Sequence, residues 1–288
     1  MLYKLVKQPS IKYTLISLYK SAIRRDCMIK TGTYLDLLLM IVMIVATYYY
    51  YEKTKDPNWK PFIRHIPALD AIREGVGKSV EEDKPVHFAM GQSGGQLYSN
   101  LVSMTLTALA FLRYVTITCA EYGARLIVHL PSQTESIPLI EGTAREGFAF
   151  AGKPEMYRRD DMRYYGRGAL TWTQGVTASY AEEGVGLNLS IGIFYSDCPI
   201  SLEMAHILGG MNVGGTGRWI MVYAFAMMCD YVFLGEEIYA AAAQVSEDPI
   251  MISGILIEEV GKFFVYILLI VGTLLAAVGL DVASLLSL

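Results

Sequence analysis

Two long apolar stretches constrain this chain more than any other feature of its sequence. Residues 34–51 and 263–280 are 18 residues long, and 16 residues of the first and 15 of the second are apolar. An α-helix rises about 1.5 Å per residue, so each stretch would cover roughly 27 Å, close to the hydrocarbon thickness of a bilayer. Four tyrosines at 48–51 end the first stretch, and tyrosine is enriched at the level of the lipid headgroups. We therefore predict two transmembrane helices, at residues 34–51 and 263–288.

The rest of the chain has the composition of a globular domain. Charged residues make up 18% of the sequence and apolar residues 53%, whereas ordinary soluble domains are roughly 25% charged and 45–50% apolar. The two apolar stretches account for the difference, and about 210 residues between them are enough for one domain with its own core. The predicted organisation is a basic segment at 1–33, a helix at 34–51, a domain at 52–262 and a helix at 263–288.

Residues 9–25 form a basic amphipathic pattern within the N-terminal segment. Ile11, Leu15 and Leu18 fall on one stripe of a helix, and Lys12 and Lys20 fall on the other side. This pattern is typical of a helix that lies on a membrane surface. It also suits a helix that packs against a partner, and the sequence leaves both interpretations open.

The distribution of lysine and arginine gives mixed signals on the direction in which the chain crosses the membrane. Lysine and arginine are equally frequent just before and just after the first apolar stretch, but Lys262 precedes the second stretch and no basic residue follows it. Because basic residues concentrate on the cytoplasmic side, we expect a two-span protein of the cell membrane with a cytoplasmic domain. The seven basic residues before position 34 argue for the opposite orientation.

Between the two stretches, short apolar runs alternate with helical patterns. The predicted strands are 85–90, 125–130, 187–194, a short strand before the sequence NVGGTGR at 212–218, and 231–234. Strands joined by helices of ten or more residues form right-handed crossovers, so the predicted fold is α/β, a doubly wound, mostly parallel sheet of about five strands. Two further apolar stretches, 97–112 and 219–234, are interrupted by polar residues and are predicted to be buried core.

Charge and cysteine usage exclude some classes of function. The net charge is −4 and the central domain has no basic block, which argues against binding to nucleic acid. The four cysteines are widely spaced and form no CxxC pair, so we expect reduced thiols. His87 and His129 fall inside predicted strands without acidic or cysteine ligands at metal-binding spacing, and we predict no metal site.

Two phrases of the central domain carry a resemblance. The sequences FIRHIPALDAIREGVGKSVEEDKPVHF at 62–88 and CDYVFLGEEIYAAAAQVSEDPI at 229–250 resemble those of an uncharacterised family of prokaryotic membrane proteins, defined only by a domain of unknown function. The resemblance covers about residues 62–280. It implies two transmembrane helices and a cytoplasmic Rossmann-like domain, and it implies no activity.

Ligands of parallel sheets bind beyond the carboxyl ends of the strands, near the point where the strand order reverses. The predicted loops at that edge include two glycine-rich sequences, GQSGGQ at 91–96 and GGTGR at 214–218, which could present backbone N–H groups to an anion. The same glycines would also serve tight turns alone. The candidate ligand-binding residues are Gln92, Ser93, Gly94, Gly95, Asp197, Gly214, Gly215, Thr216, Arg218, Glu236 and Glu237.

Known catalytic patterns are incomplete in this sequence. Gly91, Ser93 and Gly95 form a GxSxG sequence after a predicted strand and before a predicted helix, as in the nucleophile elbow of hydrolases. The elbow requires an acid and then a histidine at later strand ends, but after the candidate acids Asp197 and Glu236 the sequence offers only His206, on a predicted helix. His129 could serve only if the chain order differs. Glu236 and Glu237 begin a helix, where carboxylates favour the positive end of the dipole. Metal binding or acid–base chemistry by the pair is the alternative.

The sequence therefore favours a membrane-anchored, non-catalytic α/β module. We expect it to be a structural or ligand-binding subunit of a homo-oligomer or of a larger complex with other membrane subunits, in contact with the lipid bilayer. The alternative is a membrane-bound enzyme that uses the glycine-rich loops for a nucleotide or acyl substrate. No cofactor is identified by the sequence.

Overall fold

The computed structural model describes residues 34–278 except 57, 58, 60, 62, 63, 94–96 and 197. The chain forms two compact units, one of Met1–Glu52 with Leu256–Leu288 and one of Lys53–Ile255. The predicted amphipathic pattern at 9–25 lies outside the described residues.

The central unit is built on one parallel sheet of six strands. The strands are β1 (Val86–Ala89), β2 (Leu126–His129), β3 (Met162–Arg163), β4 (Leu187–Ile191), β5 (Met211–Thr216) and β6 (Tyr231–Leu234). Their order in the sheet is β3-β2-β1-β4-β5-β6, and every pair of neighbours is parallel. This is the strand order of Rossmann-type sheets. The predicted α/β class with a parallel sheet is confirmed, with the two-residue strand β3 in addition to the five predicted strands.

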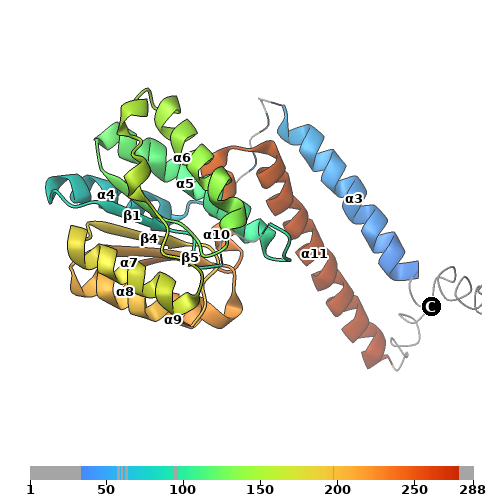
Figure 1. Ribbon diagram of the computed structural model, residues 1–288. Coiled ribbons are helices and arrows are strands. Elements are labelled where there is room, and N and C mark those ends of the chain that lie inside the picture. Colours follow the sequence, from blue (N-terminus) through green and yellow to red (C-terminus); the bar gives the residue numbers. More distant parts are fainter. Residues whose placement is uncertain are drawn as a thin grey trace, which may run out of the picture. The chain divides into compact units, whose positions relative to one another are not determined.

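Helices cover both faces of the sheet (Figure 1). One face carries α4 (Pro67–Glu81), α5 (Val102–Tyr122), α6 (Ile137–Phe150) and α10 (Glu237–Ser246), and the other carries α7 (Ala169–Glu183), α8 (Cys198–Ile207) and α9 (Val222–Met228). Short 3₁₀ turns are η1 (Thr134–Ser136), η2 (Pro154–Met156), η3 (Arg159–Asp161) and η4 (Trp219–Met221). This arrangement follows from the right-handed crossovers that parallel strands require.

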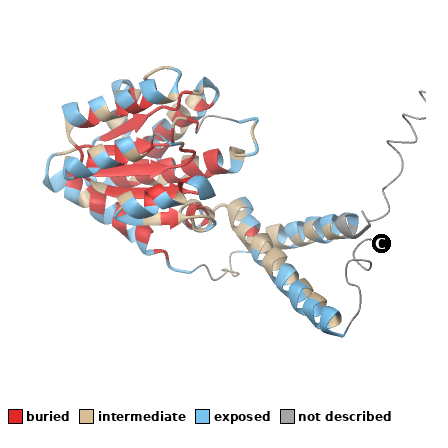
Figure 2. Ribbon diagram, turned by 90° about the horizontal axis from the view of Figure 1, so that it is seen from below, coloured by how far each residue is buried: buried red, intermediate tan, exposed pale blue. Residues whose placement is uncertain are grey.

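Strands β1, β2 and β4 are buried along their whole length (Figure 2). One hydrophobic core lies on the α5 side, with Phe111, Leu112 and Val115 fully buried. A second core lies on the α7 side around Trp172 and Phe225. Burial on both faces explains why β1 and β2 are mostly apolar apart from one histidine each. Strand β4 alternates three apolar residues with the buried polar residues Asn188 and Ser190.

Among the described residues, two helices are long and apolar enough to cross a membrane, α5 and α11 (Pro249–Ala277). Of the most apolar 18 residues, 56% are buried in α5 and 0% in α11. Helix α5 thus belongs to the domain core, as predicted for residues 97–112. The same prediction for 219–234 is wrong, because Trp219, Tyr223 and Met227 are exposed there. Helix α11 covers residues 263–277 of the predicted second span, and residues 279–288 lie outside the described part of the chain. The predicted first span forms most of α3 (Tyr34–Thr54), but it is not one of these two helices, and its crossing of a membrane stays a prediction.

Candidate functional site

The strand order reverses between β1 and β4, so the crevice expected to bind ligands lies where these two strands end. The backbones continue side by side beyond the strands. Ile193 N–H donates to Met90 O at 3.1 Å, and Ser132 N–H donates to Gln92 O at 2.9 Å. The segments that follow β1, β2, β4, β5 and β6 form the carboxyl edge of the sheet.

Glycine is needed at the start of this edge because the two backbones approach closely. Gly91 has φ +80°, and a Cβ there would lie 2.0 Å from Ile193 O. Gly192 has φ +143°, and a Cβ there would lie 2.4 Å from Met90 O. These two glycines therefore have a structural role, which accounts for part of the glycine-rich sequence after β1.

Several buried polar atoms of the carboxyl edge have no hydrogen-bond partner. Within the described residues, the buried side-chain atoms without a partner are Gln92 Oε1, Thr105 Oγ1, Ser132 Oγ, Ser136 Oγ, Tyr157 OH and Arg218 Nη1. Gln92 follows β1, Ser132 follows β2 and Arg218 follows β5. Buried polar groups are nearly always paired in folded proteins. Their concentration at this edge indicates a place where a polar ligand would satisfy them.

Arg218 is the cation of this edge. Its Cζ lies 4.2 Å from the centroid of the Tyr195 ring, which follows β4. Arg218 N–H donates to Thr216 Oγ1 at 3.2 Å, which orders the turn after β5. No ion pair joins Arg218 to an acidic residue in the described part of the chain, whereas Arg125 binds both Asp161 and Glu183. A guanidinium that is oriented by stacking and lacks a carboxylate partner is suited to an anion.

Three of the predicted loop residues lie in a strand instead. Gly214, Gly215 and Thr216 belong to β5 and are buried, so the loop predicted at 214–218 begins at Gly217. A Cβ at Gly214 would lie 2.3 Å from Phe225 Cδ1 and 2.5 Å from Cys229 Sγ. Gly214 allows α9 to pack closely on the sheet, which the sequence pattern did not reveal.

The helix after β1 also begins later than predicted. The sequence predicts it from about Leu97, but α5 starts at Val102, so Ser93 does not open the helix. A nucleophile elbow places its serine at a sharp turn from strand to helix, and Ser93 is nine residues before α5. Gly94, Gly95 and Asp197 lie outside the described residues.

Glu236 and Glu237 stand where the sequence placed them, at the start of α10. Glu236 is the N-cap residue, and its carbonyl accepts hydrogen bonds from Tyr239 N–H and Ala240 N–H. Glu237 Oε1 pairs with Arg64 Nη2 at 2.7 Å. The expected side-chain capping by Glu236 is not observed. The ion pair with Arg64 favours a role of Glu237 in anchoring the segment before α4 over acid–base chemistry.

The two histidines of the sheet pair with each other. His87 Nδ1 lies 3.0 Å from His129 Nε2, His87 Nε2 lies 2.8 Å from Gly184 O, and His129 Nδ1 lies 2.9 Å from Tyr165 OH. Because Gly184 O can only accept, His87 Nε2 carries a proton, His129 Nε2–H donates to His87 Nδ1, and Tyr165 O–H donates to His129 Nδ1. Both rings are neutral. His129 is the last residue of β2, at the carboxyl end of the strand, and its two ring nitrogens are occupied by His87 and Tyr165. The described residues contain no cluster of three potential metal ligands among His, Cys, Asp and Glu.

The residue that sequence reasoning missed at this edge is Tyr195. The sequence signal for Tyr195 was its position directly after the predicted strand 187–194. That strand, β4, is the neighbour of β5, which precedes Arg218.

Comparison with known proteins places the chain in a family without assigning an activity. No curated protein and no solved structure matches it. Residues 26–286 match the family described as Domain of unknown function (DUF6754), which confirms the resemblance to an uncharacterised family, while the membrane character that the resemblance implies stays a prediction. Since the match extends over most of the sequence, the chain belongs to the DUF6754 family.

Proposed function

We propose that this protein is a membrane-anchored, non-catalytic α/β module that binds a small anionic ligand at the carboxyl edge of its sheet. The observation that carries the proposal is Arg218, whose guanidinium stacks on Tyr195 and has a buried Nη1 without a hydrogen-bond partner. Gln92 and Ser132 add further unpartnered polar atoms to the same edge.

The energetics of Arg218 support binding of an anion. A buried donor without a partner costs about 1–3 kcal/mol, and more when the donor is charged. An anion that accepts a hydrogen bond from Arg218 Nη1 would offset this cost, because charge-assisted hydrogen bonds are roughly twice as strong as neutral ones. Stacking on Tyr195 holds the guanidinium plane, so little further ordering is needed on binding.

The contacts of the nucleophilic and basic groups favour binding over catalysis. His87 and His129 bond to each other in the sheet interior, and Glu237 is held by Arg64. Ser93 lies well before the start of α5. The alternative of an enzyme for a nucleotide or acyl substrate gains no specific support from these contacts.

Anchoring in the membrane is supported by α11. Its apolar surface is unburied, and a helix of that length and hydropathy is stable in water only when it is covered. We propose that α11 and α3 both cross the bilayer and that the α/β domain faces the cytoplasm.

The test is binding of defined anions to the full chain in detergent. Inorganic phosphate, ADP and a fatty acid are titrated while the melting temperature of the protein is followed. We expect at least one of these anions to raise the melting temperature of the wild type and to leave that of Arg218→Ala unchanged. Arg113→Ala is the matched control, because the Cζ of Arg113 also stacks on an aromatic ring, 5.4 Å from the Phe150 centroid, on α5. Equal shifts for both variants would contradict the proposal.

A further inference from the structure

The outer face of helices α8 and α9 is unusually apolar. Trp219 is 83% exposed, Met227 81% and Ile207 68%. The exposed large apolar residues of this α8–α9 face are Ile200, Ile207, Trp219, Ile220, Tyr223 and Met227. Residues 219, 220, 223 and 227 follow the spacing of one helical stripe, so they form a ridge rather than scattered exposed positions.

The opposite layer of helices is different. Helix α4 carries Asp70, Arg73, Glu74 and Lys78, whereas α9 has no charged residue and α8 has only Glu203 apart from His206. Helices that face solvent normally carry charged residues on that side. Helix α6 of the opposite layer exposes Leu139 and Phe150 but also carries three charged residues, whereas the α8–α9 face combines several exposed apolar side chains with a single carboxylate. Such a surface is typical of one that a partner covers.

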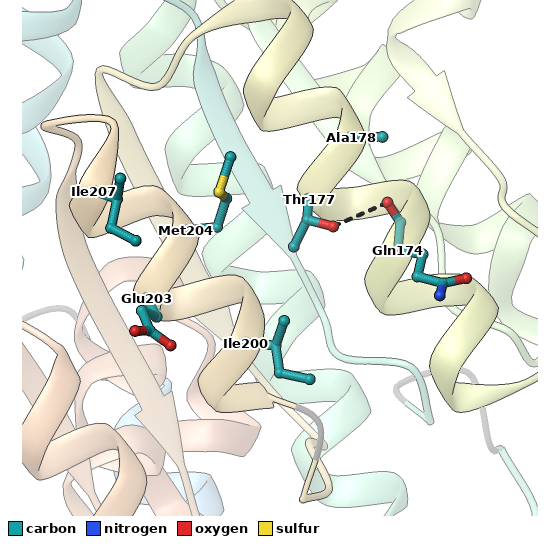
Figure 3. Close-up of a pocket in the computed structure, with 7 residues that line it drawn as sticks. All are labelled: Gln174, Thr177, Ala178, Ile200, Glu203, Met204 and Ile207. Atoms are coloured by element: carbon teal, nitrogen blue, oxygen red, sulfur yellow. Dashed lines mark hydrogen bonds between the residues drawn. The ribbon is translucent and has the colours of Figure 1, made fainter.

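A groove runs beside the ridge, between α7 and α8 (Figure 3). It has a volume of about 600 Å³. The groove is lined by Gln174, Thr177 and Ala178 of α7 and by Ile200, Glu203, Met204 and Ile207 of α8. The groove is large enough for the side chains of a ridge such as that formed by Tyr223 and Met227.

We propose that the α8–α9 face binds the same face of a second copy of this chain, with the α9 ridge of each copy in the α7–α8 groove of the other. This interface is separate from the anion site and goes beyond the proposed function. A two-fold axis requires a surface that complements itself, and a ridge beside a groove on one face has that property.

The area of the face fits a stable dimer. The six large apolar side chains each expose on the order of 100 Å². Together with the groove between α7 and α8, they approach the ~800 Å² per partner of a standard interface. Exposed Trp, Tyr and Met side chains are also the types enriched at the centres of protein interfaces.

A lipid surface fits this face less well. Glu203 lines the groove, and its carboxylate would be desolvated if acyl chains covered the whole face. The ridge and groove offer no cluster of lysine and arginine to attract anionic headgroups, the usual feature of interfacial membrane helices. Against a second copy, Glu203 can remain at the solvated rim.

The first test is cross-linking in native membranes. Two full-length chains with different tags are co-expressed in a Cys27→Ser background, one with Met227→Cys and the other with Ile207→Cys. A short bis-maleimide is expected to join the two tags at least tenfold more efficiently than it joins a matched pair, Phe150→Cys and Leu139→Cys, on α6. Both control positions are exposed, at 72% and 46%. Equal yields, or attachment of a photoreactive lipid to position 227 in place of the cross-link, would overturn the proposal.

The second test measures the oligomeric state of the purified full chain in mild detergent. We expect a dimer for the wild type and for Phe150→Glu, and at least a tenfold increase in the dissociation constant for Met227→Glu. Because Met227 is 81% exposed, its substitution should leave the melting temperature of the monomer unchanged, which separates loss of association from loss of folding. A monomeric wild type, or a dimer that Met227→Glu leaves intact, would refute the proposal.

Discussion

At the scale of single residues, the paired histidines show how burial determines protonation. Both His87 and His129 are fully buried, and Tyr180 packs edge-on against both rings. Burial lowers the pKa of His87 to about 4, although the Gly184 carbonyl opposes the shift. Burial also lowers the pKa of His129 well below its usual value, and His87 and Arg163 add to that effect. The pair therefore stays neutral at any pH near 7.

This pair predicts that the protein loses stability in mild acid. An unfolded histidine binds a proton below about pH 6.5, whereas His87 in the fold binds one only near pH 4, so the unfolded state holds more protons between these values. The contribution of His87 is fully present above pH 6.5 and falls by about 3 kcal/mol by pH 4. The measurement is the free energy of unfolding of the detergent-solubilised protein from pH 7.5 to 4.5. His87→Gln should flatten the decrease, and His206→Gln, at an exposed position on α8, should not. A steep decrease that survives in His87→Gln would show that other groups cause it.

At the scale of secondary-structure elements, β5 shows why local signals can mislead. Glycine usually marks a turn, and the sequence GGT at 214–216 was therefore assigned to a loop. In the fold, the space of a Cβ at Gly214 is occupied by Phe225 and Cys229, so the glycine serves the contact between strand and helix. That requirement arises only when residues distant in the sequence pack together.

The same contact predicts a large effect of a single methyl group. Gly214→Ala would place Cβ 2.3 Å from Phe225 Cδ1, and overpacking of a core costs about 1–3 kcal/mol. We expect a lower melting temperature, with the affinity of the folded protein for anions unchanged. Gly142→Ala on α6 is the control, because a Cβ there meets no atom within 4 Å and alanine is the better helix former. If Gly142→Ala were as destabilising as Gly214→Ala, the packing explanation would be incorrect.

Most elements of the sheet were predictable because each buried strand is a short run rich in apolar residues that lies between helical patterns. Strand β3 was not, since it has only two residues, one of them Arg163, and follows a polar segment. The last predicted helix, from Glu236, is interrupted where Glu247 adopts φ +52° ahead of Pro249, which separates α10 from α11. Short strands and breaks between helices depend on tertiary contacts, and a hydrophobic pattern alone contains little information about them.

At the scale of the whole molecule, the topology determined where a site was expected but not which side chains meet there. Arg218 was identified from the sequence because it follows a strand at the carboxyl edge. Its stacking partner Tyr195 is 23 residues earlier in the chain, and the two come together only because β4 and β5 are neighbours in the sheet. Such pairs require the strand order, which hydrophobic periodicity does not specify.

The anchoring role of α11 leads to a final prediction for the intact protein. Ile270 lies near the middle of the apolar stretch 263–280 and is 62% exposed. Arginine at the centre of a transmembrane helix costs about 2.5–3.5 kcal/mol on insertion. Ile270→Arg should therefore increase the fraction of the full chain that alkaline carbonate extracts from membranes. Ile250→Arg is the matched control, because Ile250 is 64% exposed on the same helix but lies before the apolar stretch. If both variants resist extraction as the wild type does, α11 does not anchor the protein, because an arginine at the centre of a true transmembrane helix would make the free energy of insertion less favourable.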